Sequence, residues 1–162
     1  MSESVHVARL SSHPEVLSVL ATWFEAEWPA WYGPAGPGDA LQDLRGFADD
    51  RGLPIGVVAF RNGALCGVAA LKATSIASHD HLTPWAAAGL VAPAWRQQGI
   101  GAVLLAALES EAQHLGHRFI HCGTRTATSL LQRSGWSLFE DVVHDGQPLG
   151  IYRKSLGPGP RE

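Results

Sequence analysis

A turn that contains two glycines is the segment of this chain best suited to bind a ligand. It reads Arg-Gln-Gln-Gly-Ile-Gly-Ala over residues 96–102 and joins an expected strand to a long stretch with helical spacing of apolar residues. Glycines let the backbone approach a ligand closely, and the first N–H groups of a helix have no partner within it. Such a turn can bind a phosphate or pyrophosphate. The alternative is a glycine-containing helix start without a ligand.

The turn does not match the common phosphate-binding motifs. It lacks the Gly-Lys-Ser/Thr of a P-loop, and Gly99 with Gly101 does not complete Gly-x-Gly-x-x-Gly. The turn alone therefore leaves the class of phosphate ligand open.

A second group of residues could accept a proton. His79, Asp80 and His81 precede an expected strand, and Glu25 and Glu27 lie at the end of the expected first helix. An unperturbed imidazole has a pKa near ~6.5, which suits a general base at neutral pH. A solvated loop is the alternative for the His-Asp-His segment. No third ligand at useful spacing is evident, so no metal site is expected.

The elements that must position these residues alternate along the chain. Apolar patterns predict strands over residues 5–10, 55–60, 64–73, 85–91, 118–122, 136–143 and 149–154. Helical spacing predicts helices that begin within 11–15 and extend over 39–50, 100–115 and 126–133. Segment 29–38 holds three prolines and three glycines and is expected to be a loop through which no helix runs. The order β-α-α-β-β-β-α-β-α-β-β predicts one mixed α/β (α+β) domain over residues 1–156, with a flexible tail at 157–162.

Composition narrows the class of protein. The 162 residues are 46% hydrophobic and 17% charged, which argues against a disordered chain. A net charge of −3 disfavours a nucleic-acid partner. No apolar run approaches the ~18 residues of a membrane span, and no signal-peptide pattern is present, so a cytoplasmic protein without a membrane partner is expected. Cys66 and Cys122 are too few for a disulfide framework and are expected to be buried thiols.

Three segments fit one pattern when they are taken together. They are residues 88–93 (Ala-Gly-Leu-Val-Ala-Pro), residues 96–102, and residues 130–136 (Leu-Leu-Gln-Arg-Ser-Gly-Trp). They resemble the strand exit, the Arg/Gln-x-x-Gly-x-Gly/Ala loop and the C-terminal Leu-Tyr-x-x-x-Gly-Phe segment of the Gcn5-related N-acetyltransferase (GNAT) family. The order of elements also matches, so the resemblance covers nearly the whole chain. It implies a twisted mixed β-sheet with a V-shaped split beside its central strand, and acyl-CoA in that split.

The resemblance also implies which residues bind CoA. Backbone N–H groups of residues 98–102 would hold the pyrophosphate, and the Arg96 side chain or the backbone near it would help. The residues implied for the pyrophosphate are Arg96, Gln97, Gln98, Gly99, Ile100, Gly101 and Ala102. Leu90 and Val91 would offer backbone groups to the pantetheine arm, and an N–H of their strand would polarise the thioester carbonyl. Thr124 stands where many relatives have an Asn that contacts pantetheine.

The catalytic residues follow less directly from the resemblance. Leu131 stands where relatives often have a Tyr that protonates the thiolate, so the thiolate leaves unaided, a water serves, or another group replaces the Tyr. The central strand also lacks the Glu that many relatives use as a base. The remaining base candidates are His81, Asp80 and Glu27, and His121 near the expected split is a weaker one.

The acceptor side is implied to lie at the first two helices and their loop. Residues 15–50 carry seven acidic residues against Arg45 alone, which would attract a cationic amine. Trp28, Trp31 and Tyr32 could form an aromatic wall for it. Solvated acidic helix faces and core aromatics are the alternatives.

These observations predict an acetyl-CoA-dependent N-acetyltransferase that moves the acetyl group directly to a primary amine of a small-molecule or peptide acceptor. One alternative is a CoA-binding sensor or partner-binding domain with little or no catalysis. Another is a nucleotide or phosphosugar binder that uses the same helix start. The last strands of such folds often pair between subunits, so the resemblance also suggests a homodimer.

Overall fold

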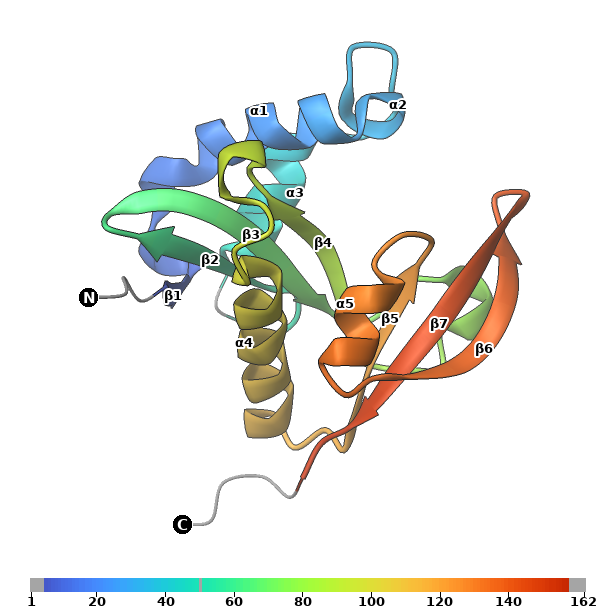
Figure 1. Cartoon of the computed structure of the whole chain (residues 1–162). Coiled ribbons are helices and arrows are strands. Elements are labelled where there is room, and N and C mark those ends of the chain that lie inside the picture. The colour runs from blue at the N-terminus through green and yellow to red at the C-terminus, as the bar shows by residue number, and fades with distance from the viewer. Residues whose placement is uncertain (1–4, 50, 158–162) are drawn as a thin grey trace.

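The central element of the computed structural model, which describes residues 5–49 and 51–157, is a seven-stranded β-sheet (Figure 1). The strand order is β1-β2-β3-β4-β5-β7-β6. The strands are β1 (His6–Arg9), β2 (Ile55–Arg61), β3 (Ala64–Lys72), β4 (Trp85–Val91), β5 (Phe119–Thr124), β6 (Ser137–His144) and β7 (Gln147–Ser155). The mixed α/β fold expected from the sequence is confirmed. Apart from Gly157, the expected tail lies outside the described residues.

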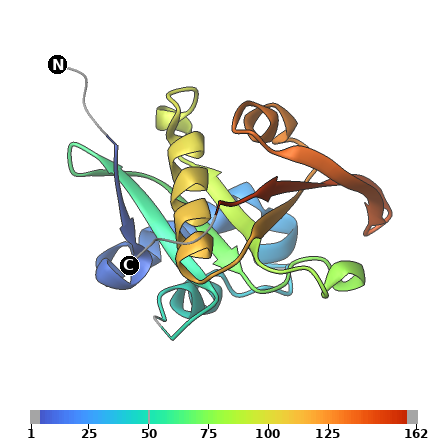
Figure 2. The ribbon, with the colours of Figure 1, turned by 90° about the horizontal axis from the view of Figure 1, so that it is seen from below.

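Helices cover both faces of the sheet (Figure 2). They are α1 (Leu17–Glu27), α2 (Pro29–Tyr32), α3 (Ala40–Phe47), α4 (Ile100–His114) and α5 (Thr128–Arg133). One face of β2 and β3 packs against α4, and the other packs against α1 and α3, because successive side chains of a strand point to opposite faces. Asp39 caps α3 as expected, since its carboxylate accepts a hydrogen bond from the Gln42 N–H at 3.0 Å.

The expectation that no helix runs through residues 29–38 is wrong for the first four of them. Pro29 begins α2, because proline is tolerated in the first turn, where its missing N–H costs no helical hydrogen bond. The Gly33 N–H closes that turn by donating to the Pro29 carbonyl at 2.9 Å. The first long helix also starts later than expected, at Leu17, after two short 3-10 turns.

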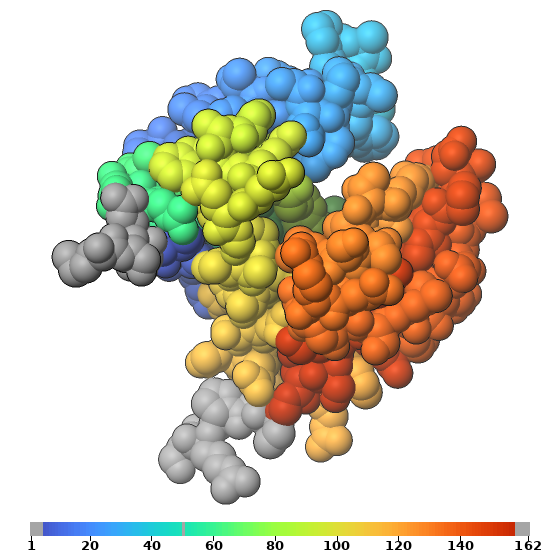
Figure 3. Space-filling model, in the orientation of Figure 1, coloured from blue at the N-terminus to red at the C-terminus, as the bar shows by residue number. Residues whose placement is uncertain are grey.

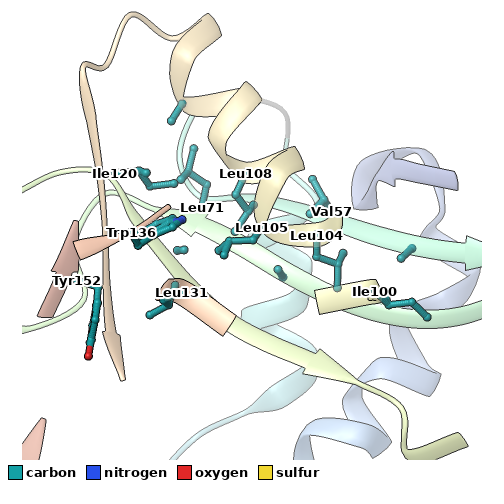
Figure 4. Packing of buried hydrophobic residues seen from close by; sticks show 14 of the residues in the cluster. Val57, Leu71, Ile100, Leu104, Leu105, Leu108, Ile120, Leu131, Trp136 and Tyr152 are labelled. Carbon is teal, nitrogen blue, oxygen red and sulfur yellow. The ribbon is translucent and has the colours of Figure 1, made fainter. Parts of the chain in front are cut away.

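The core beneath α4 fixes this helix against the sheet (Figure 4). Leu104 and Leu108 of α4 are 2% and 1% exposed and belong to the same buried cluster as Val57 and Leu71 of the sheet. Leu131 of α5 joins this cluster at 1% exposure. The position of the α4 N-terminus, where the glycine turn lies, is therefore set by close packing.

A partly buried ion pair holds the C-terminal strands to the same helix. The Lys154 ammonium of β7 donates to Glu109 Oε1 of α4 at 2.7 Å and to the Ser134 carbonyl at 2.9 Å. The indole N–H of Trp136 donates to Glu109 Oε2 at 3.2 Å. One carboxylate thus joins α4 to Trp136, directly before β6, and to Lys154 near the end of β7.

Both cysteines are free, with Cys66 buried and Cys122 half-buried. Over residues 5–49 and 51–157, none of the helices has the length and apolar character that a membrane crossing needs.

Candidate active site

The sheet splits between β4 and β5. These two strands run parallel and pair at one position, Trp85 opposite His121, next to a hydrogen bond from the His121 N–H to the Pro84 carbonyl at 3.0 Å. Beyond that point the strands diverge toward their C-terminal ends. A cavity of about 550 Å³, here called the split cavity, lies between them and is bounded by the end of α1, by α4 and by residues 122–127. Figure 3 shows a hollow between the α1–α2 region (blue) and the segments after β5 (orange).

A bulge in β4 lies in the wall of this cavity. Val68 pairs with Leu90 and Ala70 pairs with Ala87, so the two β4 residues between them have no partner in β3. Ala88 adopts a φ of 53°, which is rare for a residue with a side chain. Both Ala88 and Gly89 line the split cavity. Bulges free N–H and C=O groups from the ladder, so this one can offer them to a ligand.

The glycine turn bounds a second cavity of about 580 Å³ at the start of α4, here called the helix-start cavity. Gly99 has a φ of 81°, a left-handed conformation that glycine adopts without strain. The first N–H groups of α4 have no partner within the helix, and residues 99–102 at this helix start line the cavity. Val91, Gly101 and Leu130 line both cavities, so the two form one continuous groove.

Most residues that the resemblance implied for CoA line this groove. Leu90, Val91, Gly101 and Thr124 line the split cavity, and the helix-start cavity is lined by Arg96, Gln97, Gly99, Ile100, Gly101 and Ala102. Gln98 lines neither, because its side-chain oxygen accepts a hydrogen bond from Arg61 at 2.7 Å. The Thr124 hydroxyl oxygen accepts from the Thr126 and Ala127 N–H groups at 3.1 and 2.7 Å, at the start of α5.

Glu27, at the end of α1, forms an ion pair between a residue of the split cavity and a residue of the helix-start cavity. Its carboxylate lines the split cavity and pairs with the Arg96 guanidinium at 3.3 Å. Arg96 also donates from Nε to the Val91 carbonyl at 2.9 Å. One arginine therefore contacts the exit of β4 and the only predicted base that lies at the groove.

The three aromatic residues expected at the acceptor side are not equivalent. Trp28 lines the split cavity and packs edge-on against Phe24, with ring centroids 5.1 Å apart. Tyr32 donates its hydroxyl to Asp43 Oδ2 at 2.7 Å, and burial together with this carboxylate raises the pKa of the Tyr32 hydroxyl. Trp31 is 54% exposed. Neither Trp31 nor Tyr32 lines either cavity, so their role in acceptor binding stays a prediction.

The His-Asp-His segment lies against β6 and outside both cavities. His79 is buried, with Nε2 3.1 Å from Glu140 Oε1 and Nδ1 2.8 Å from the Ser78 hydroxyl. The His81 ring stacks on the His79 ring with centroids 5.7 Å apart. His81 and Asp80 line neither cavity, and their function as bases stays a prediction. No group of three or more His, Cys, Asp or Glu residues suited to a metal ion occurs within residues 5–49 and 51–157.

His121 is a buried histidine beside the split. It is 3% exposed, its Nδ1 lies 3.2 Å from the Pro84 carbonyl oxygen, and its Nε2 has no hydrogen-bond partner among the described residues. Burial lowers the pKa of His121, because an imidazolium would lose its hydration there. Since His121 lines neither cavity, the groove gives it no direct access to an acceptor.

Neither Leu131 nor Cys122, which both line the split cavity, is a good acid for the leaving thiolate. Leu131, at the position of the family's Tyr, is buried and lines the cavity with an apolar side chain. Cys122 also lines it, and burial raises the pKa of this thiol to about 12. Neither Tyr32 nor Tyr152 lines either cavity.

Sequence analysis missed several groove residues. Arg125 lines the split cavity and Arg133 lines the helix-start cavity. Arg125 directly follows Thr124, so a charged neighbour of a motif position was the available signal. For the β4 bulge the signal was Gly89 inside an expected strand, which is typical of bulges.

The chain belongs to the Acetyltransferase (GNAT) family, whose model matches residues 18–136. The chain is therefore an enzyme of the acyltransferase class. No curated protein sequence matches the chain significantly.

Solved structures share the fold at low sequence identity. An aminoglycoside 6'-N-acetyltransferase complexed with coenzyme A has 14% identity and a TM-score of 0.77, over 96% of this chain and 99% of the other. The structure of yncA from Salmonella typhimurium with its cofactor acetyl-CoA has 18% identity and a TM-score of 0.68, over 100% and 98%. The ribosomal-protein-S18-alanine N-acetyltransferase from Escherichia coli has 16% identity and a TM-score of 0.67, over 97% of each chain.

Proposed function

We propose that this chain is an acetyl-CoA-dependent N-acetyltransferase that transfers the acetyl group directly to a primary amine of a small-molecule or peptide acceptor. The observation that carries the proposal is the continuous groove, which runs from the glycine start of α4 into the split between β4 and β5. Its two ends match the two chemical parts of acetyl-CoA, a charged phosphate portion and a long uncharged arm.

The phosphates are assigned to the helix-start cavity. Unpaired N–H groups of the first α4 turn and the positive end of the helix dipole favour an anion there. Arg96 and Arg133 line the same cavity and supply cations. The pantetheine arm is assigned to the split cavity, where the β4 bulge offers backbone groups in the manner of a neighbouring strand.

The proposed reaction is a single acyl transfer. The lone pair of a neutral amine attacks the thioester carbonyl carbon, the C–N bond forms, and the C–S bond breaks to release the CoA thiolate. An N–H group at the β4 bulge near Ala88 and Gly89 would stabilise the negative charge that develops on the carbonyl oxygen. The nitrogen must also lose a proton, directly or through water.

Glu27 is the base candidate that this proposal favours. It lines the split cavity, whereas His81 and Asp80 do not. Its carboxylate pairs with Arg96 at 3.3 Å, and a carboxylate at this place suits an incoming ammonium group, from which it takes a proton through water. Leu131 and Cys122 leave the thiolate without a strong acid, so a water is assigned to protonate it.

A CoA-binding domain with little or no catalysis is the second candidate. The observation that favours it is the apolar Leu131 at the position of the family's Tyr. Turnover of acetyl-CoA with any amine, followed as release of free thiol, would exclude this candidate.

Thermal unfolding with acetyl-CoA, CoA and adenosine diphosphate tests the proposal first. A ligand at ~100 times its Kd adds about 2.7 kcal/mol to the free energy of unfolding. In a domain of this size that corresponds to a rise in Tm of about 5–11 °C. A larger rise with acetyl-CoA than with the diphosphate supports the proposal. Equal rises would support the nucleotide binder, and no rise would contradict CoA binding altogether.

A homodimer through the edge strand β6 is part of the proposal. Leu138, Phe139 and Val143 of this strand are 50%, 40% and 76% exposed, and an exposed apolar edge strand is prone to pair. Light scattering of the purified chain would measure the mass, and a monomer at all concentrations would contradict the dimer. The cytoplasmic location expected from the sequence stays a prediction.

A further inference from the structure

Two side chains of opposite charge face the split cavity from opposite walls. Among the described residues that line this cavity, the charged ones are Glu27 and Arg125. Glu27 ends α1 on one side of the split, and Arg125 follows β5 on the other side. The rest of the lining is apolar or uncharged, apart from backbone groups.

Arg125 is held in place by the hairpin between β6 and β7. Its Nη2 donates to the His144 carbonyl oxygen at 2.7 Å, and the side chain is otherwise exposed. A guanidinium has five N–H donors in a fixed plane, so one hydrogen bond orients it and leaves donors for a ligand. The hairpin therefore presents a positioned cation at the mouth of the split.

No charged group of acetyl-CoA is proposed to lie in the split cavity, where Arg125 supplies a cation. The phosphates have Arg96 and Arg133 at the helix-start cavity, and the pantetheine arm and the acetyl group carry no charge. A cation beside the uncharged arm thus points to the other substrate. An acceptor with a cationic amine alone would be repelled by it.

We propose that the acceptor amine also carries a carboxylate, and that Arg125 binds this carboxylate while Glu27 faces the amine. The acceptor class is then an amino acid or a related amine with a carboxyl group. Arginine suits this role because its planar donors match a carboxylate with two parallel hydrogen bonds. This inference rests on the proposed function and adds the substrate class.

The test measures binding to the 162-residue chain saturated with CoA, which forms a ternary complex without turnover. The probes are L-leucine, β-alanine and 4-aminobutanoate, each compared with its own carboxamide, which keeps the amine and removes the charge. Titration calorimetry gives the Kd of each probe. At least one acid is expected to bind about 10- to 100-fold more tightly than its carboxamide, the range for a hydrogen bond between charged groups.

Three variants separate recognition from structure. Arg125→Gln keeps a polar N–H side chain but loses the charge, and it is expected to remove the preference for the acid while binding of the carboxamide changes less than about twofold. Arg125→Lys is expected to restore part of the preference. Arg51→Gln is the control, because Arg51 is exposed, pairs with Asp49 at 3.6 Å and lines neither cavity.

The outcomes distinguish this inference from the proposed function. Equal Kd values for acids and carboxamides, or no binding of any probe, would overturn the inference while acetyl-CoA stabilisation and turnover of other amines left the proposed function standing. If Arg125→Gln weakened acetyl-CoA as strongly as the acid, Arg125 would be a CoA residue and the inference would be wrong. If wild-type chain showed no stabilisation by acetyl-CoA, the proposed function itself would fail.

Discussion

Replacing Gly99 with Ala should impair acetyl-CoA binding more than it impairs folding. Gly99 precedes α4 with a φ of 81°, and a Cβ built there has no protein atom within 4 Å. The new methyl group would therefore meet no wall of the protein. It would project into open space at a residue that lines the helix-start cavity, where the phosphates are proposed to bind.

Two effects of Gly99→Ala have separate magnitudes. The left-handed conformation costs a residue with a side chain about 1–2 kcal/mol, which lowers Tm by about 2–8 °C in a domain of this size. Displacing the phosphate from one backbone N–H removes a hydrogen bond to a charged group, about 1.5–3 kcal/mol. The Kd for acetyl-CoA should then rise about 10- to 150-fold.

Gly116 provides a matched control at the other end of the same helix. It has a φ of 88°, and a Cβ there also meets nothing within 4 Å. Gly116 lines neither cavity. Gly116→Ala should therefore lower Tm by a similar amount and leave the Kd for acetyl-CoA unchanged.

Calorimetric titration of both variants with acetyl-CoA, beside their thermal unfolding, completes the assay. The reasoning holds if the two variants lose similar stability and only Gly99→Ala loses affinity. It is refuted if Gly99→Ala remains folded and binds acetyl-CoA as tightly as Gly116→Ala does. The glycine turn would then be a helix start without a ligand.

Three further predictions concern charged and titratable groups. Glu27→Gln should lower kcat/KM for amines about 10²- to 10⁴-fold, the loss expected of a general base, with the Kd for acetyl-CoA within about threefold of wild type. Glu25→Gln, outside both cavities, is the control in the same thiol-release assay, and equal rates for both variants would remove Glu27 from the mechanism. Glu109→Gln should lower Tm by about 4–8 °C, because losing the partner of the Lys154 ammonium costs roughly 2 kcal/mol. An unchanged Tm in calorimetry would contradict a stabilising role of this ion pair. Between its lowered pKa and 6.5, His121 binds fewer protons in the folded chain than in the unfolded chain. The free energy of unfolding should therefore fall as the pH drops through that window. His121→Phe should reduce this pH dependence in denaturant titrations, and an unchanged pH dependence would assign it to other groups.

The order of strands and helices could be predicted because the local patterns agree with the tertiary structure. Asn62 and Gly63, both with positive φ, form the turn between β2 and β3 that an Asn-Gly pair indicates. The α2 turn was missed because a proline suggests a break, although its effect depends on whether it starts or interrupts a helix. The late start of α1 was missed since two 3-10 turns carry the same apolar spacing as a helix start.

The candidate site was most predictable where backbone groups are proposed to bind the ligand. The helix start leaves a local mark in the sequence at Gly99, because its left-handed conformation favours glycine. Arg133 left no such mark, since its place at the helix-start cavity depends on the packing of α5 beside α4. For the same reason, the sequence could not show which of the base candidates lies at the groove. His81 and Glu27 are equally suitable by chemistry, and the fold brings only Glu27 to the groove.

This difference between backbone and side-chain recognition has a consequence for specificity. The proposed CoA half of the groove is built largely from main-chain groups at α4 and β4, so substitutions elsewhere can leave it intact. The proposed acceptor half uses two side chains, Glu27 from α1 and Arg125 from the segment after β5, which lie on different sides of the split and far apart in the sequence. Either can change without disturbing α4, because neither belongs to the buried core. The acceptor can therefore differ between chains that share this fold and its CoA groove, and residues 27 and 125 are where we expect that difference to be encoded.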